Sequence, residues 1–348
     1  MKQFEAPWTI FFSWGAFVFL FVNFLTGIVL AQHLNFLEFI LSLLLGSTFL
    51  SLSLYAAIWV SVKFNVNYSE AIYKFFPFGV HLKIIPLFVL LAVNVGWYSI
   101  QLEISINLLP RLLENLGDWE VWFKTFLISY LFASGAFKYE YSWLKIFGAL
   151  AMIVFSIIAA CSLFKINYPN NLNIADMNDD HISKLLKGSL IVYGTWGFSS
   201  STCIMDIAKY TNKFFKTFFY ATIAILLADI LLILLGYIFS LQYEIFSLNK
   251  LFRVLEVKYL PLIVFISLWS TNDSNFFSSM RVVEKLGFNK KTAFLFLPAI
   301  SAILVLLFKE DIFSILGKWL KIMGWTSVGF SILWWSLLFK YRGRGFNV

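Results

Sequence analysis

The densest run of polar side chains lies inside an apolar stretch near residue 270. Residues 267–275 read Ser-Leu-Trp-Ser-Thr-Asn-Asp-Ser-Asn. Ser267, Ser270 and Thr271 share one face of a helix, because they are spaced at i, i+3 and i+4. Polar side chains within a membrane are costly and indicate function by default. Three hydroxyl oxygens on one face could hold a small hard cation, or each hydroxyl could bond back to its own helix.

Two tryptophans on two other apolar stretches could bind a flat ring between them. Trp97 follows Asn94 by about one turn, and Trp196 begins a polar patch that includes Ser199. The two indoles would stack on the faces of the ligand. Asn94, Asn272 and nearby hydroxyls such as Ser199 would bind the donors and acceptors on its edge. Because the chain has 13 Trp, the competing interpretation is that each indole packs in the core or anchors at the membrane interface.

The composition around these residues is that of a polytopic membrane protein. Of 348 residues, 60% are apolar, 20% aromatic and 13% charged, about half the charged fraction of a soluble domain. This excludes a soluble globular protein, a disordered chain and a disulfide scaffold. A helix needs about 20 apolar residues to cross a bilayer. About ten segments reach that length, at roughly 8–30, 35–62, 84–108, 120–137, 142–164, 187–208, 215–241, 258–280, 291–308 and 319–339.

The charged residues predict orientation and exclude some activities. Most of the 27 Lys and Arg fall in loops on the same side of the membrane as the N-terminus. This predicts a multi-pass protein of the cell membrane with both termini cytoplasmic. We expect no nucleic-acid partner, because the net charge of +8 is carried by these short loops beside the bilayer. No phosphate-binding loop, nucleophile elbow or zinc motif occurs, so we expect neither an enzyme nor a prosthetic group.

Three acidic residues outside the polar run 267–275 are weaker candidates for function. Glu103 and Asp229 are candidates for proton-linked steps, or polar groups that face a seam between helices. Asp206 closes span 6 just before Lys209, and we expect it at the cytoplasmic surface, where it would gate or form an ion pair.

Ten spans divide into two halves of five. Ser-Trp-Gly at 13–15 matches Thr-Trp-Gly at 195–197, and an odd number of spans in each half makes the second half inverted. Paired Gly interruptions predict broken helices around a mid-plane site, whereas the alternative is that Gly15 and Gly197 are packing glycines. We predict a first repeat at 1–165, an extracytoplasmic connecting loop at 166–186, and a second, inverted repeat with a short cytoplasmic tail at 187–348.

The chain resembles nucleobase-cation symporter family 1, and within it the bacterial cytosine permeases, in three places. Phe-Gly-Val at 78–80 is followed by Pro86 and by Asn-Val-Gly-Trp-Tyr at 94–98. Gly-Thr-Trp at 194–196 precedes Asp206, and Leu-Trp-Ser-Thr-Asn-Asp at 268–273 is close to the permeases' Trp-Thr-Thr-Asn-Asp. The resemblance runs from Gly27 to Lys340. It implies an all-α membrane protein with a 5+5 inverted repeat, the leucine-transporter-type fold of the amino-acid/polyamine superfamily.

The resemblance also implies site residues. In that family one aromatic on span 3 and another on span 6 sandwich the base, which implies Trp97 and Trp196. The family's usual Gln before the span 3 aromatic is replaced by Asn94, and its substrate-contacting Asn on span 8 corresponds to Asn272, beside Asp273. The family's Na+ site combines span 1 carbonyls with span 8 oxygens, which implies Ala16 (or Gly15 in its place), Phe19, Ser267, Ser270 and Thr271. Family members usually carry twelve spans, and this sequence matches ten.

The main hypothesis is a secondary transporter that imports a planar nucleobase, cytosine or a related pyrimidine or purine, by Na+-coupled symport and alternating access. The second keeps the fold but makes the protein a proton-coupled carrier of another small heterocycle, such as a hydantoin, allantoin or a thiamine precursor, or of an amino acid. The third is a ligand-sensing receptor subunit on a transporter fold. All three need the lipid bilayer as partner, and none sets the oligomeric state.

Overall fold

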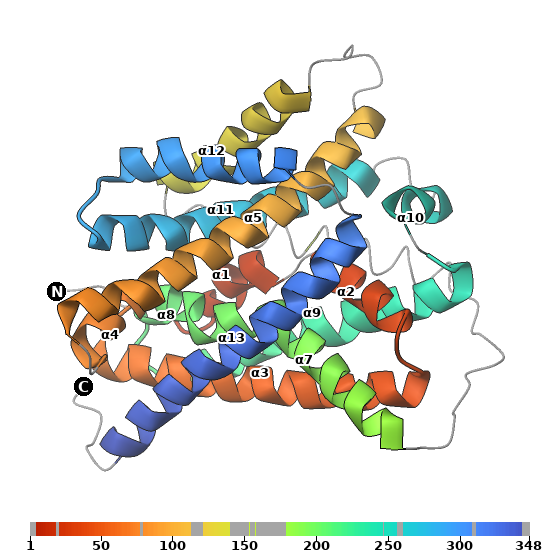
Figure 1. Cartoon of the computed structure of the whole chain (residues 1–348). Helices are drawn as coiled ribbons and strands as arrows, with labels where there is room; N and C mark the ends of the chain where they lie inside the picture. Colours follow the sequence, from red (N-terminus) through yellow and green to blue (C-terminus); the bar gives the residue numbers. More distant parts are fainter. Residues whose placement is uncertain are drawn as a thin grey trace.

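The computed structural model describes residues 5–18, 21–76, 79–112, 121–139, 179–245, 247–255, 260–307 and 311–342, together with Ile153 and Ile157. The described chain is helical (Figure 1). Its elements are α1 Thr9–Val18, α2 Phe21–Ala31, α3 Phe36–Phe64, α4 Tyr68–Phe75, a 3-10 turn Val80–Lys83, α5 Ile84–Leu112, α7 Asp179–Ser201, α8 Cys203–Ala208, α9 Phe214–Tyr243, α10 Leu248–Leu255, α11 Leu260–Lys285, α12 Lys290–Leu307 and α13 Ile312–Tyr341. Residues 121–139 are also helical.

The predicted spans coincide with these helices, apart from span 142–164, which lies outside the described residues except for Ile153 and Ile157. Within the described chain, five helices are long and apolar enough to cross a membrane: α3, α5, α9, α12 and α13. The predicted span 187–208 is divided into α7 and α8, the described part of span 8–30 falls in α1 and α2, and α11 carries the polar run 267–275. The protein is therefore a multi-pass membrane protein, while the number of ten crossings stays a prediction.

Span 6 is divided. It consists of α7 and α8, separated at Thr202, whose φ of −130° and ψ of −73° are not helical. The described residues of span 1 fall in α1 and α2, and residues 19–20 between them lie outside the described residues. The register that matches 13–15 with 195–197 places Thr202 opposite Leu20, so a matching break in span 1 stays a prediction. Gly15 and Gly197 lie inside α1 and α7, so the break in span 6 follows Gly197 and is not at it.

Helices of one predicted half pack on the corresponding helices of the other half. Span 2 (α3) packs on α7 of span 6, and span 7 (α9) packs on α1 and α2 of span 1. Span 3 (α5) packs on span 8 (α11), which run beside each other in Figure 1. Such reciprocal pairing agrees with two related halves. The boundaries predicted for the halves stay a prediction, and α7 begins at Asp179, within the stretch 166–186 predicted as a loop.

Small residues allow the closest helix crossings. A Cβ atom on Gly236 of α9 would lie 1.9 Å from the carbonyl oxygen of Phe24, and one on Gly27 of α2 would lie 2.1 Å from that of Ile233. At the crossing of α7 and α13, a Cβ atom on Gly194 would lie 1.9 Å from the carbonyl oxygen of Leu320. Glycine is required at these points because the two backbones touch, as is common between membrane helices. Helix α2 is therefore held tightly against α9.

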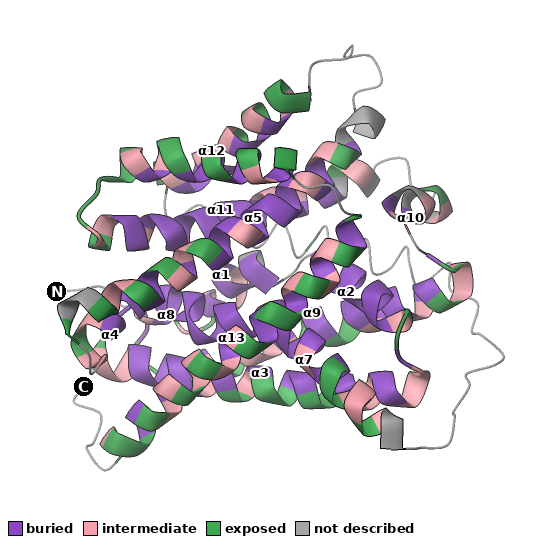
Figure 2. Ribbon diagram, viewed as in Figure 1, coloured by how far each residue is buried: buried purple, intermediate pink, exposed green. Residues whose placement is uncertain are grey.

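Burial follows the expected division between interior and lipid-facing helices. Buried residues gather on α1, α2, α8 and α11, whereas exposed residues run along α12 and α13 (Figure 2). Large apolar side chains on the outer faces are exposed, among them Phe215 at 72%, Trp325 at 70% and Phe296 at 60%. In a bilayer such side chains face hydrocarbon, so their exposure is that of a lipid-contacting surface.

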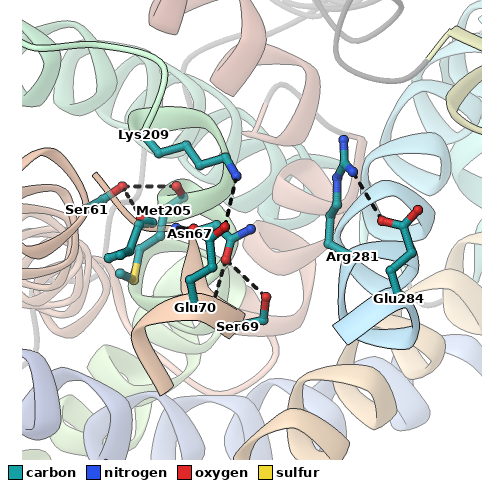
Figure 3. Close-up of polar contacts among 9 residues, drawn as sticks. Ser61, Asn67, Ser69, Glu70, Met205, Lys209, Arg281 and Glu284 are labelled. Carbon is teal, nitrogen blue, oxygen red and sulfur yellow. Dashed lines mark hydrogen bonds and ion pairs between the residues drawn. The ribbon is translucent and has the colours of Figure 1, made fainter. Parts of the chain in front are cut away.

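Both ends of the described chain lie at the same end of the bundle. The N–H of Glu5 donates to the carbonyl of Tyr210 at 2.8 Å, and Lys63 at the end of α3 donates to the carbonyl of Tyr341 at 2.8 Å. Lys209, next to Tyr210, forms an ion pair with Glu70 of α4 (Figure 3). This arrangement agrees with an even number of crossings, and the side on which the ends lie stays a prediction.

Candidate functional site

The two tryptophans predicted to form a clamp lie face to face. Trp97 of α5 and Trp196 of α7 have their ring centroids 6.4 Å apart and their planes 11° from parallel. Both side chains are buried, with 4% and 5% of their surface exposed. Trp319 of α13 meets the ring of Trp97 edge-on at 6.3 Å, and it reaches so close because residue 96 is Gly. Three helices far apart in the sequence thus supply the aromatic walls of one buried site.

Asn23, which sequence reasoning did not single out, holds Trp196 in place. The indole Nε1 of Trp196 donates to Oδ1 of Asn23 at 2.7 Å. Asn23 lies near the start of α2, and its Nδ2 donates to the carbonyl of Val18 at 3.1 Å and to Asp229 at 3.3 Å. The position of Asn23 within an apolar span could have pointed to it, because an amide there is costly unless it has hydrogen-bond partners.

Several buried polar atoms near the aromatic pair have no hydrogen-bond partner within the described chain. They are Nδ2 of Asn94, Oε1 of Gln101, Oδ1 of Asn272 and Oγ of Ser200. Asn94 and Gln101 lie about one turn before and after Trp97 on α5, and Asn272 donates to the carbonyl of Tyr98 at 3.4 Å. A buried polar group without a partner costs about 1–3 kcal/mol, so these atoms are suited to a polar ligand.

Gln101 was missed by sequence reasoning, although its spacing of four residues from Trp97 places both on one helix face. Ser199 is buried one turn after Trp196, and its role as a ligand contact stays a prediction. Asp273 has a different local partner: its Oδ1 accepts the backbone N–H of Ala136 at 2.8 Å. That bond ties α11 to helix 121–139.

The hydroxyls predicted to bind a cation lie buried on α11, which packs against α1. Ser270 and Thr271 donate to the carbonyl of Ser267 at 2.9 Å and 3.3 Å, so the alternative that they bond back to their helix is realised in this structure. A hydroxyl that donates its proton keeps oxygen lone pairs. Ala16 lies in α1, whereas Phe19 lies outside the described residues.

Asp206 is not at a surface, and the expectation that it ends there was wrong. Its side chain is 3% exposed, and its Oδ2 accepts the hydroxyl of Ser278 on α11 at 2.9 Å. It is Lys209, one turn later, that reaches Glu70 at 3.8 Å (Figure 3). The error came from treating span 6 as one straight helix, because the break at Thr202 turns the short α8 into the bundle. Glu103 is partly exposed and bonds to Asn107 on its own helix.

The short helix α8 is therefore held from two sides. Ser61 of α3 donates to the carbonyl of Met205 at 3.0 Å, while Ser278 of α11 bonds to Asp206 (Figure 3 draws the first of these contacts). Met205 lies in the last turn of α8, where backbone carbonyls are free to accept such bonds. All six residues of α8 are also buried, so packing holds this helix together with the two hydrogen bonds.

Comparison with solved structures gives a strong match. Over 90% of this chain and 75% of the other, the structure matches Mhp1, a nucleobase-cation-symport-1 family transporter, in a closed conformation with bromovinylhydantoin bound, at a TM-score of 0.75 and 12% identity. This chain has the Mhp1 fold. The inward-facing conformation of Mhp1 matches with a TM-score of 0.68 and 14% identity, over 96% of this chain and 74% of the other. The resemblance found in the sequence is thus confirmed at the level of the fold.

The likeness to Mhp1 lies in the structure more than in the overall sequence. No family model matches the sequence, and no curated protein matches it either. At 12–14% identity a likeness to Mhp1 assigns the arrangement of helices, whereas ligand and coupling ion must be argued from the residues of this chain.

Proposed function

We propose that this protein is a secondary transporter that carries a planar nitrogenous heterocycle, cytosine or a related nucleobase, together with Na+, by alternating access. The observation that carries the proposal is the pair of parallel indoles, Trp97 and Trp196, buried between α5 and the divided span 6. Function lies in the site and not in the fold, so the proposal rests on what this pair and its neighbours can bind.

The spacing of the pair suits a flat ligand. A ring stacked between two indoles needs about twice the 3.4 Å spacing of stacked bases, or about 7 Å. The ring centroids lie 6.4 Å apart with the planes 11° from parallel, which is within the range of aromatic rings in direct contact, so the indoles would have to separate to admit one ring. A bulky or non-planar ligand would need a much larger displacement, and this favours a heterocycle over an amino acid.

The unpartnered polar atoms around the pair match the edge of such a ring. Nucleobases present amide-like donors and acceptors in the ring plane. Nδ2 of Asn94 offers a donor, and Oδ1 of Asn272 and Oε1 of Gln101 offer acceptors. This mixed set supports a neutral ligand with alternating donors and acceptors over an anion. Ser199 and Asp273, proposed as further contacts from the sequence, would serve at the margin of the site.

Sodium would bind where α1 packs against α11. The hydroxyls of Ser270 and Thr271 are buried there, and Na+ prefers oxygen ligands, as other hard cations do. Backbone carbonyls at the end of α1, near Ala16 and Phe19, would complete the set with Ser267. Because a cation at this junction fixes the broken helix that also carries Asn23, ion and base binding would be coupled in both directions.

Alternating access would use the short helices. In transporters with inverted repeats, one bundle rocks against the other around a fixed site. The contacts that hold α8, from Ser61, Ser278 and the pair Lys209–Glu70, lie at the end of the bundle that is cytoplasmic in the predicted orientation. Breaking these contacts would open the cytoplasmic end of the bundle, whereas the site would stay closed to the opposite side of the membrane.

One alternative substrate has a specific observation in its favour. The closed form of Mhp1 is bound to bromovinylhydantoin, and a hydantoin ring is also flat and carries alternating amide groups. Cytosine and a hydantoin would fit the same clamp, so the choice between them rests on which edge groups Asn94, Gln101 and Asn272 prefer.

The experiment is equilibrium binding to the purified protein with cytosine, uracil, adenine, guanine, hydantoin and leucine, each in Na+ and in choline. We expect one heterocycle to bind, more tightly in Na+, and leucine not to bind. Binding that ignores Na+ would refute the sodium site. Binding of leucine alone would refute the aromatic clamp. Uptake into liposomes then separates a transporter from a receptor, which would bind the ligand without accumulating it.

A further inference from the structure

A carboxyl group lies fully buried in the middle of α9. Asp229 is 0% exposed and is placed near the centre of the 30-residue helix Phe214–Tyr243. An acidic side chain at such a position is expensive and is retained for a reason, often for the movement of ions or protons. The proposed clamp and the Na+ site do not use it.

A chain of hydrogen bonds connects Trp196 to Asp229 through Asn23. The Nε1 of Trp196 can only donate, and it lies 2.7 Å from Oδ1 of Asn23. This orients the amide of Asn23, so that its Nδ2 faces the other way. Nδ2 then donates to the carbonyl of Val18 at 3.1 Å and to Oδ1 of Asp229 at 3.3 Å. The carboxyl is thereby linked to one ring of the clamp through a single side chain.

The charge of an ionised Asp229 would have little compensation. Its Oδ2 has no hydrogen-bond partner in the described chain, and its Oδ1 has one neutral donor. A buried charge needs an ion partner or several hydrogen bonds. The geometry of this conformation therefore fits a carboxyl that holds a proton.

Charged groups on the neighbouring helices are engaged elsewhere. The helices packed on α9 are α1, α2 and α3. The described residues of α1 and α2 include no titratable side chain. On α3, Glu38 pairs with His181, Tyr55 packs on Phe214 and Phe218, and Lys63 binds the carbonyl of Tyr341. The titratable residues of α9 itself lie about two turns or more from Asp229, namely Lys216, Tyr220, Tyr237 and Tyr243.

We propose that Asp229 is a proton-binding site, separate from the Na+ site, whose occupancy is transmitted to Trp196 through Asn23. A proton suits this site better than a metal ion, because the amide hydrogens of Asn23 point at the carboxyl and at the carbonyl of Val18, where a metal ion would need oxygens. A proton from solvent adds to the carboxylate oxygen and leaves a neutral acid. Loss of that proton creates a charge that draws Nδ2 of Asn23 and shifts its bond to Trp196.

The form in which Asp229 holds a proton is the one that fits this structure, where the two indoles are stacked. The heterocycle should therefore bind more tightly at low pH, and its binding should take up a proton by the same coupling. This last step rests on the proposed function, because it needs a ligand. The proton site itself does not, so it can be tested without any ligand.

The first experiment is a pH titration of intrinsic fluorescence in the ligand-free protein, from about pH 5 to about pH 9, where buried carboxyls are known to titrate. We expect a transition in the wild type that is lost in Asp229→Asn and in Trp196→Phe. The matched control is Glu103→Gln, a second acid in a span, which should keep the transition. An unchanged transition in Asp229→Asn, or none in the wild type, would overturn the proposal.

Infrared spectroscopy gives a second reading that does not depend on the folding of a variant. The wild type should show the carbonyl band of a buried, protonated carboxyl group at low pH, and this band should fade over the same pH range as the fluorescence change. A band that persists unchanged across that range would contradict a proton site that exchanges with solvent.

The coupling is tested by proton uptake. Cytosine or hydantoin, whichever binds in Na+, is added to weakly buffered protein with a pH indicator dye. The wild type should take up a proton and Asp229→Asn should not. If neither ligand binds but the ligand-free titration is present, the proposed function fails and the proton site stands. If a ligand binds and the titration is absent, the proton site fails alone.

Discussion

Truncation of Trp196 to alanine tests the clamp most directly. The indole lies parallel to Trp97, with 6.4 Å between ring centroids, and is 5% exposed. Alanine removes one stacking face and also the donor to Asn23. Stacking of a base on an aromatic ring is worth about 1–3 kcal/mol. At about 1.4 kcal/mol for each tenfold change, the Kd of the heterocycle should rise by about 5-fold to about 140-fold.

The assay should be equilibrium binding of a radiolabelled base, because removal of a Trp changes the fluorescence signal itself. Trp196→Phe keeps a ring but lacks the N–H group, so it separates stacking from the bond to Asn23. We expect this variant to lose less affinity than Trp196→Ala. The matched control is Trp325→Ala, because Trp325 is 70% exposed on α13 and faces lipid in the proposed membrane orientation.

A double variant with Trp97→Ala sharpens the test. If both rings contact the same ligand, the losses from the two single variants should not add, because neighbouring residues that share a partner are coupled. An unchanged Kd in Trp196→Ala would refute the sandwich. An equal loss in Trp325→Ala would show that the effect is on folding and not on the site.

Three further predictions concern the ion, the helix crossing and a cap. Ser270→Ala combined with Thr271→Ala should make the Kd of the heterocycle equal in Na+ and choline, and a preserved difference would place the ion elsewhere. Gly236→Ala should lower the free energy of unfolding by about 1–3 kcal/mol, because its Cβ would lie 1.9 Å from the Phe24 carbonyl oxygen. The control is Gly329→Ala, because an added Cβ there has nothing within 4 Å, and this variant should keep its thermal stability in detergent. An equal loss of stability in Gly236→Ala and Gly329→Ala would contradict the reasoning. Asn67→Ala should lower the stability of α4 by about 1 kcal/mol, because it removes the cap in which Asn67 accepts the N–H of Glu70 at 2.8 Å. Proteolysis near that helix should become faster, and an unaltered rate of proteolysis would refute this prediction.

The positions of the membrane helices could be predicted because apolar length is a local property. A run of about 20 apolar residues must form a helix in hydrocarbon, whatever its neighbours are. For this reason α3, α5, α9, α12 and α13 fall where the sequence places them. The types of the site residues were also within reach, because Trp, Asn and clustered hydroxyls within such runs are rare enough to notice.

The locations of the breaks were predicted less well. Gly15 and Gly197 attracted attention, yet both lie inside helices, and the break in span 6 occurs at Thr202. Gly197 serves packing instead, since a Cβ there would lie 2.7 Å from the ring of Tyr193. A helix ends where its carbonyls find other partners, and Trp334 of α13, which donates to the carbonyl of Ser201 at the end of α7, lies far away in sequence.

The sequence by itself determined that this is a helical membrane protein, and it named Trp97, Trp196 and the span 8 hydroxyls as candidate site residues. These follow from hydropathy, spacing and residue type, which act locally along the chain. Only the tertiary structure decided that the two indoles face each other, that Asn23 joins Trp196 to Asp229, that Asp206 is buried and that Asp273 binds Ala136. Each of these depends on contacts between distant segments, and single-sequence patterns carry no information about which distant partners a polar group will find.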